Sequence, residues 1–246
     1  YGWRFFGGSG GRELPLLLGL FLTVWAFLYV PLWPSLLAGY TDLASLIPML
    51  VALGLALSTN IAERPERRRL ILLGLSLYLC FLLRRWFIFA AGSFYLTYAI
   101  ISLGSLDRSD WSTGLKNIVK NLLTAGLTNL VLMMIFQFPV FRGMIFNKYS
   151  DQYAAFQTPL SDSLGLIYSA TGPVILILAV VSPLMAFIRR RQVAANIFAV
   201  RCPVIYFAAF TRIQGLGMHH TLPVTLFVWL LAFGGLISLY QALPKT

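Results

Sequence analysis

Charged residues are scarce in this chain, and acidic residues are the scarcest of them. Aspartate and glutamate number 8 in 246 residues, and all charged residues together make up 11% of the chain. Soluble domains carry about a quarter charged residues, whereas 59% of this chain is apolar and its mean hydropathy is +0.79. The composition therefore excludes an ordinary soluble domain and indicates an integral membrane protein.

Several kinds of chemistry lack the residues that they need. The two cysteines, Cys80 and Cys202, lie inside apolar runs, so a disulfide framework or a cysteine metal site is excluded. The chain has no GxxxxGKS or GxxxxGKT phosphate loop, no GxGxxG dinucleotide motif and no Ser-His-Asp set. Its apolar runs contain no carboxylate, which disfavours proton-coupled transport. Nucleic acid is not an expected partner, because the net charge of +11 comes from short basic loops.

Apolar runs long enough to cross a bilayer recur along the chain. A transmembrane helix needs about 20 mostly apolar residues. Turn-forming residues such as Pro34, Pro65 and Gly143 separate the runs. We count eight runs, over residues 14–33, 43–59, 70–83, 86–106, 117–138, 164–188, 193–210 and 221–243. We therefore predict an all-α integral membrane fold, a polytopic bundle of seven to eight transmembrane helices in one domain over 1–246, with a short helical hairpin around 70–106.

The basic residues predict how the chain is oriented, because loops rich in lysine and arginine stay in the cytoplasm. With eight spans, one side of the membrane receives 13 of the 19 basic residues. They are Arg4, Arg12, Arg64, Arg67, Arg68, Arg69, Arg108, Lys116, Lys120, Arg189, Arg190, Arg191 and Lys245. We predict that this side is the cytoplasm, that both termini lie there, and that the membrane is the bacterial inner (plasma) membrane.

Arg84 and Arg85 interrupt an otherwise uncharged stretch over residues 70–106. Two adjacent guanidinium groups at the centre of one span would cost several kcal/mol, so we expect them at the tip of a half-depth hairpin on the outer face. Arginine binds phosphate bidentately and keeps its charge. The pair therefore predicts a site for a lipid phosphate, and the alternative is that the arginines only reach toward lipid headgroups.

Two acidic residues of the outer face are candidates for catalysis. Asp42 follows a Gly-Tyr-Thr turn and opens a helix, so it is either an N-cap or a general base or metal ligand. Asp151 lies among amides and phenols, a composition typical of sugar sites and of amphipathic surface segments alike. Both are predicted as catalytic residues.

The same face holds polar residues that we expect to bind a lipid phosphate or a sugar together with the arginine pair. They are Arg142, Tyr153, Gln157, Arg212, Gln214, His219 and His220. The adjacent histidines do not face one site on a helix, and a zinc ion needs three or four ligands, so we predict no metal ligands among them. The sequence identifies no cofactor, and a divalent metal ion is an open alternative.

Four segments resemble membrane glycosyltransferases of the GT-C type, the dolichyl-phosphate-mannose and protein O-mannosyltransferase-like family. Residues 36–57 read LLAGYTDLASLIPMLVALGLAL, similar to the segment where a G-Y-x-D turn starts a span. Residues 67–100 read RRRLILLGLSLYLCFLLRRWFIFAAGSFYLTYAI, similar to the adjoining region. Residues 147–159, NKYSDQYAAFQTP, and 210–220, FTRIQGLGMHH, look like its outer loops.

The resemblance implies an active site on the non-cytoplasmic face, a donor sugar on a polyprenyl phosphate, and membrane lipids as partners. Asp42 would be the acidic residue of the turn, and Arg84 or Arg85 would bind the lipid phosphate. Members of the family carry an acidic motif in the first outer loop, and none precedes Asp42 here. We therefore expect either that the chain lacks its N-terminal part or that it is a non-catalytic subunit or lipid-binding scaffold of a larger membrane complex, with protein partners.

Overall fold

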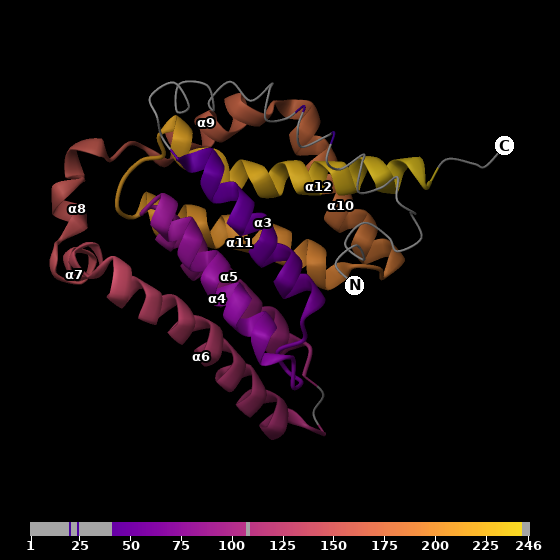
Figure 1. The fold of residues 1–246 in the computed structure, drawn as a ribbon. Coiled ribbons are helices and arrows are strands. Elements are labelled where there is room, and N and C mark those ends of the chain that lie inside the picture. Colours follow the sequence, from indigo (N-terminus) through magenta and orange to yellow (C-terminus); the bar gives the residue numbers. More distant parts are fainter. Residues whose placement is uncertain (1–19, 21–23, 25–40, 107–108, 243–246) are drawn as a thin grey trace.

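The computed structural model describes residues 20, 24, 41–106 and 109–242, and all regular structure in these ranges is helical (Figure 1). The predicted first span, residues 14–33, falls almost entirely outside the described residues, as do both termini. The elements are α3 (Asp42–Ser58), α4 (Arg67–Leu83), α5 (Phe87–Gly104), α6 (Trp111–Phe136), α7 (Phe138–Phe146), α8 (Tyr149–Gln152), η2 (Ala154–Phe156), α9 (Leu160–Thr171), α10 (Pro173–Arg189), α11 (Val193–Thr211), η3 (Met218–Thr221) and α12 (Leu222–Tyr240).

Four described helices are long and apolar enough to cross a membrane: α5, α6, α11 and the segment Met218–Tyr240 that joins η3 to α12. The helices α9 and α10 form a fifth if they count as one span, although they meet at 94°. Gly172 makes that bend, because its φ of 76° lies in the left-handed region that favours glycine. The all-helical class and the presence of several apolar helices are confirmed, whereas the count of eight spans stays a prediction.

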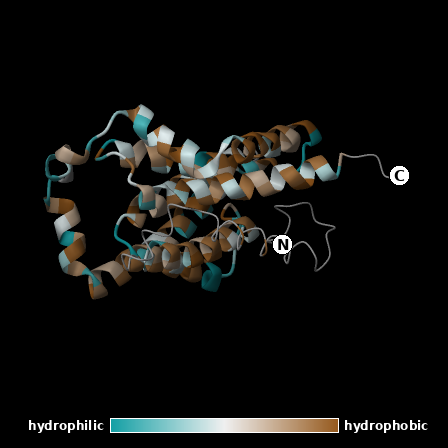
Figure 2. Ribbon diagram, turned by 90° about the horizontal axis from the view of Figure 1, so that it is seen from above, coloured by the Kyte–Doolittle hydropathy of each residue, from teal (hydrophilic) through white to brown (hydrophobic). Residues whose placement is uncertain are grey.

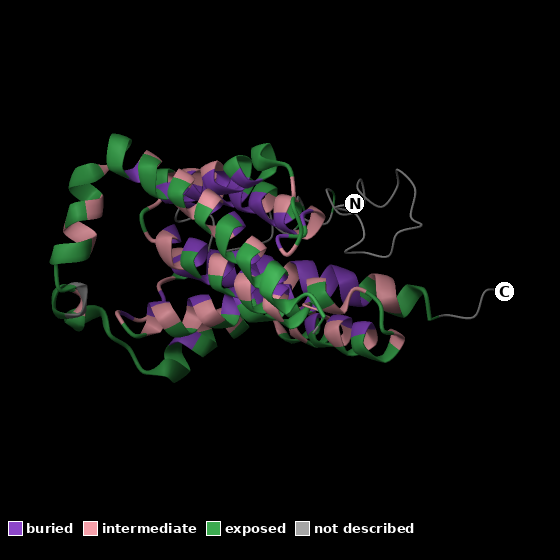
Figure 3. Ribbon diagram, turned by 90° about the horizontal axis from the view of Figure 1, so that it is seen from below, coloured by how far each residue is buried: buried purple, intermediate pink, exposed green. Residues whose placement is uncertain are grey.

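Helices pack chiefly in antiparallel or crossing pairs, α3 with α4, α4 with α6, α5 with α11 and α10 with α12. Two glycines allow close approach within two of these pairs. A Cβ on Gly74 of α4 would meet the Ala125 carbonyl of α6, and a Cβ on Gly235 of α12 would meet the Leu178 carbonyl of α10. Buried residues lie on the inner sides of the helices, and exposed residues line the outer sides (Figure 3).

Two side-chain amides connect α6 to the turn between α3 and α4. The Asn121 side chain donates hydrogen bonds to the carbonyls of Ile61 and Glu63, and Asn117 donates to the carbonyl of Ala62. These amides supply hydrogen-bond donors to backbone carbonyls of the turn. They therefore hold the turn beside residues 117–121 of α6. The lengths of α3 and α4 then determine what meets at the other end.

The predicted hairpin around 70–106 is present, with its break at Arg84, Arg85 and Trp86. It is not a half-depth hairpin, because α4 has 17 residues and α5 has 18, and α5 alone is long enough to cross a membrane. The stretch between α6 and α9, expected to be a long loop, contains α7, α8 and η2.

Alternation of the helices separates two chemically different ends. The basic residues of the α3–α4 turn, the start of α6 and the end of α10 lie at one end. The α4–α5 break, the α6–α7 break and the segment between α11 and η3 lie at the other. Hydrophilic residues gather in these connections, while hydrophobic residues cover the helices between them (Figure 2).

Candidate functional site

An ion pair joins the first residue of α3 to the residue that follows α4. The Arg84 Nε–H donates to Asp42 Oδ1 at 3.0 Å, and the two side chains are 21% and 2% exposed. The hydroxyl of Thr41 donates to the carbonyl of Leu83 beside it. The pair forms because α3 and α4 have 17 residues each and run antiparallel from a common turn, which brings the start of one level with the end of the other.

The carboxylate of Asp42 binds Arg84 and does not cap the N-terminus of α3. Thr41 is the N-cap of α3, and no side-chain hydrogen bond caps the helix, so the N-cap interpretation of Asp42 is wrong. Asp42 Oδ2 is buried and has no hydrogen-bond partner among the described residues. Burial raises the pKa of the Asp42 carboxyl above its usual value, while the nearby charges of Arg84 and His219 lower it.

Arg85 points away from its neighbour. Its Nη2 donates to the Tyr153 hydroxyl at 2.9 Å, and its guanidinium lies 5.1 Å from the centre of the Trp86 ring. Arg85 is exposed, whereas Arg84 is partly buried. The two arginines therefore have different partners. The Arg84 guanidinium binds the buried carboxylate of Asp42, and the Arg85 guanidinium lies at the surface against Tyr153 and Trp86.

Aromatic rings from three segments, all far from Trp86 in the sequence, surround it. Its ring centre lies 5.1 Å from that of Tyr153, 5.7 Å from that of Phe210 and 5.7 Å from that of His220, all in edge-on geometry. The rings of His219 and His220 are 3.8 Å apart. These contacts bring the predicted site residues of α8–η2 and η3 beside the arginine pair.

His220 is anchored by its backbone and by one ring nitrogen. The Gly217 N–H donates to His220 Nδ1 at 3.2 Å, and the Tyr206 hydroxyl donates to the His220 carbonyl at 2.9 Å. Its Nε2 is buried and has no hydrogen-bond partner in the described part of the chain. Because Nδ1 accepts, Nε2 carries the proton of the neutral ring.

A cavity of about 450 Å³ opens at the α4–α5 break, facing the start of α7. It is lined by Phe81, Leu82, Leu83, Arg84, Arg85, Trp86, Gln137 and Val140. Arg84 thus belongs both to the ion pair and to the cavity wall. Gln137, at the break between α6 and α7, also lines the cavity, and its Oε1 is buried without a hydrogen-bond partner in the described ranges. The cavity combines two guanidinium groups, one amide and an apolar floor.

The remaining predicted site residues do not line the cavity and differ in their exposure. Arg142 in α7, Gln157 after η2 and Arg212 after α11 are exposed and make no side-chain hydrogen bond among the described residues. Gln214 is buried. Asp151 is exposed on α8, so the second predicted carboxylate lies on the surface, unlike that of Asp42.

Three residues of the site were missed from the sequence: Trp86, Gln137 and Phe210. Trp86 directly follows the arginine pair, and Gln137 is the polar residue at the break before Pro139, so both had a local signal. Phe210 had none, since it is one apolar residue among many. Within the described ranges, no group of three or more His, Cys, Asp and Glu side chains could hold a metal ion.

No known protein family, curated protein or solved structure matches this chain.

Proposed function

We propose that this chain is a membrane glycosyltransferase of the inner membrane, with eight spans, that moves a sugar from a polyprenyl phosphate to an acceptor on the non-cytoplasmic face. One observation carries the proposal, namely that Arg84, which pairs with the buried carboxylate of Asp42, lines a cavity that is also lined by Arg85. A glycosyl transfer from a lipid phosphate needs a cation for the phosphate and a base for the acceptor. Both types of group occur here within one site.

The cations suit a phosphate that lies at a membrane surface. The cavity is at the end of the helices opposite the basic loops. Since basic loops favour the cytoplasm, we propose that this end lies at the outer face. Arg85 is exposed there, and the amide of Gln137 supplies a further donor on the facing wall. Guanidinium groups bind phosphate through two parallel hydrogen bonds, and the apolar floor suits the first carbons of an isoprenoid chain.

The carboxylate suits the acceptor. We assign Asp42 Oδ2 as the atom that takes the proton from the acceptor hydroxyl, because Oδ1 already accepts from Arg84. The hydroxyl oxygen then bonds to the anomeric carbon of the sugar as the bond from that carbon to the phosphate oxygen breaks, with inversion. The electron pair of the broken bond leaves on the lipid phosphate, where the arginines offset the charge.

The test uses purified protein in proteoliposomes with a panel of polyprenyl-phosphate hexoses, and mass spectrometry measures the release of polyprenyl phosphate. Asp42→Asn should lower release by about 100-fold or more, since it removes the base but keeps the shape of the side chain. Arg85→Gln should weaken donor binding about ten-fold, the loss of one charged hydrogen bond. Arg68→Gln, an exposed arginine at the opposite end of α4, should leave both unchanged. Full release by Asp42→Asn would refute the assigned base.

The burial of Asp42 favours a second function, a non-catalytic lipid-binding subunit of a larger membrane complex with protein partners. At 2% exposure the carboxylate is closed to solvent and bound to Arg84, as a purely structural ion pair would be. In this case the wild-type protein would bind polyprenyl phosphate through Arg85 but release none from any donor of the panel. The same assay thus distinguishes the two functions.

A further inference from the structure

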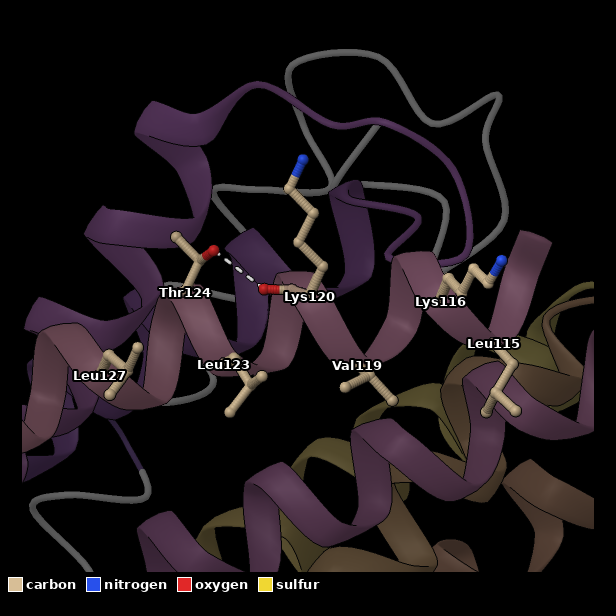
Figure 4. A pocket seen from close by; sticks show the side chains of 7 residues that line it. All are labelled: Leu115, Lys116, Val119, Lys120, Leu123, Thr124 and Leu127. Carbon is tan, nitrogen blue, oxygen red and sulfur yellow. Dashed lines mark hydrogen bonds between the residues drawn. The ribbon is translucent and has the colours of Figure 1, made fainter. Parts of the chain in front are cut away.

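A long groove runs along the outer side of α6, at the end of the molecule opposite the candidate site. It is shallow and open, with a volume of about 590 Å³, and the seven side chains that line it all come from α6 (Figure 4). Four apolar side chains recur at every fourth position along it, which are Leu115, Val119, Leu123 and Leu127. This spacing places them in one row along the helix. The last three are 48%, 55% and 53% exposed, so described helices leave the row uncovered.

A second row lies beside the first, and only its first two members are charged. Lys116 and Lys120 occupy the two turns nearest the basic end of the molecule, and Thr124 takes the next place in the row. The Thr124 hydroxyl donates to the backbone carbonyl of Lys120 at 2.9 Å, a hydrogen bond within α6. Positive charge is therefore confined to one end of an apolar groove.

We propose that this groove is a binding site for one anionic phospholipid, with an acyl chain along the apolar row and the phosphate at Lys116 and Lys120. The dimensions fit one leaflet of a bilayer. Residues 115–127 span about 18 Å of helix, and half of the hydrocarbon core measures about 15 Å. Lysine side chains reach from the helix to the headgroup level while their methylene stems cover apolar surface.

Charge identifies the occupant among lipids. The groove contains two cations and, among its lining residues, no acid, so a zwitterionic headgroup would bring an unneeded second cation to the lysines. Each lysine near an anionic lipid surface contributes about five-fold in affinity, and the two together about 25-fold. The site lies on the opposite end of the helices from Arg84 and is independent of the proposed transferase function.

The test offers the full-length protein equal amounts of dioleoyl phosphatidylglycerol and dioleoyl phosphatidylcholine in detergent, and native mass spectrometry counts the lipids retained. We expect the wild type to favour phosphatidylglycerol by about 25-fold. The double variant K116Q/K120Q should lose this preference. The matched variant R67Q/R68Q, which removes two exposed charges at the same end but outside the groove, should keep it. Equal loss in both variants, or no preference in the wild type, overturns the proposal.

A photo-crosslinking residue, p-benzoylphenylalanine, then shows what covers the groove in a membrane. In vesicles of the same two lipids, Leu123 replaced by this residue should crosslink phosphatidylglycerol preferentially. The same replacement at Ile177, an exposed apolar position of α10, should crosslink both lipids alike. A crosslink from position 123 to a peptide of this chain or of a second copy would show that protein occupies the groove, and would overturn the proposal.

Discussion

Breaking the Asp42–Arg84 ion pair tests the centre of the site through its energetics. Removing one partner of a buried ion pair costs about 3–5 kcal/mol, because the other charge stays buried and unpaired. Arg84→Gln leaves the carboxylate of Asp42, which is 2% exposed, without its cation. We therefore expect Arg84→Gln to lower the free energy of unfolding by about 3 kcal/mol, at the low end of that range because the arginine is itself 21% exposed.

Replacing the acidic partner, Asp42, should lower the free energy of unfolding by less. Asp42→Asn keeps an oxygen that accepts from Arg84 Nε, and the partly exposed guanidinium regains water, so we expect a loss of about 1.5 kcal/mol. In the double variant neither charge is left unpaired. Its loss should therefore fall about 2 kcal/mol short of the sum of the two single losses, within the range seen for residues in direct contact.

The assay is reversible unfolding of the purified protein in mixed micelles with increasing dodecyl sulfate, followed by far-ultraviolet circular dichroism. Asp42→Asn combined with Arg142→Gln serves as the control cycle, since Arg142 makes no side-chain hydrogen bond in the described part of the chain. In the control cycle, the loss of unfolding free energy in the double variant should equal the sum of the two single losses. If Asp42→Asn and Arg84→Gln also add, to within about 0.5 kcal/mol, the two side chains do not interact and the site as described is wrong.

Three further substitutions have defined outcomes. Tyr153→Phe removes the hydrogen bond to Arg85 and should weaken polyprenyl-phosphate binding about three-fold in a native mass spectrometry titration, with unchanged stability; equal binding would contradict the role of that contact. Gly235→Ala places a Cβ against a carbonyl of α10 and should cost about 2 kcal/mol in the unfolding assay, whereas Gly54→Ala, with open space around it, should cost nothing. Asn121→Ala removes the donor to the carbonyls of Ile61, which is buried, and of Glu63, and should cost about 2 kcal/mol; a loss near zero would show that water replaces the amide.

The positions of the helices follow closely from the sequence. Apolar runs bounded by basic or turn-forming residues predicted helices that the structure confirms to within a few residues, such as the run over 193–210 and α11 (Val193–Thr211). The run over 164–188 was predicted as one span and is bent by 94°. Gly172 and Pro173 in the middle of this run indicate a bend. Summed hydropathy does not detect the bend, because the residues around them are apolar.

The arginine pair could be located but not oriented from the sequence. Its break in the hairpin was visible because two charges interrupt an apolar run. Its partners were not, because they depend on where other helices begin and end. Asp42 is 42 positions away from Arg84 along the chain, and only the equal lengths of α3 and α4 bring the two together.

Contacts between distant segments were the hardest to predict. Tyr153 was a candidate by composition, and its hydrogen bond to Arg85 spans 68 positions. The approach of Phe210 to Trp86 depends on how α11 packs against α5, which no local pattern encodes. Local sequence patterns predict helices and the positions of charges. A site of this kind arises from the packing of several helix ends, which those patterns do not predict.

A structure of the protein determined by electron cryomicroscopy in nanodiscs with added polyprenyl phosphate tests the central claim most directly. We predict phosphate density in the cavity at the α4–α5 break, within about 3 Å of the Arg85 guanidinium and facing Gln137. Polyprenyl phosphate bound elsewhere on the protein, with this cavity empty of density, would contradict the account.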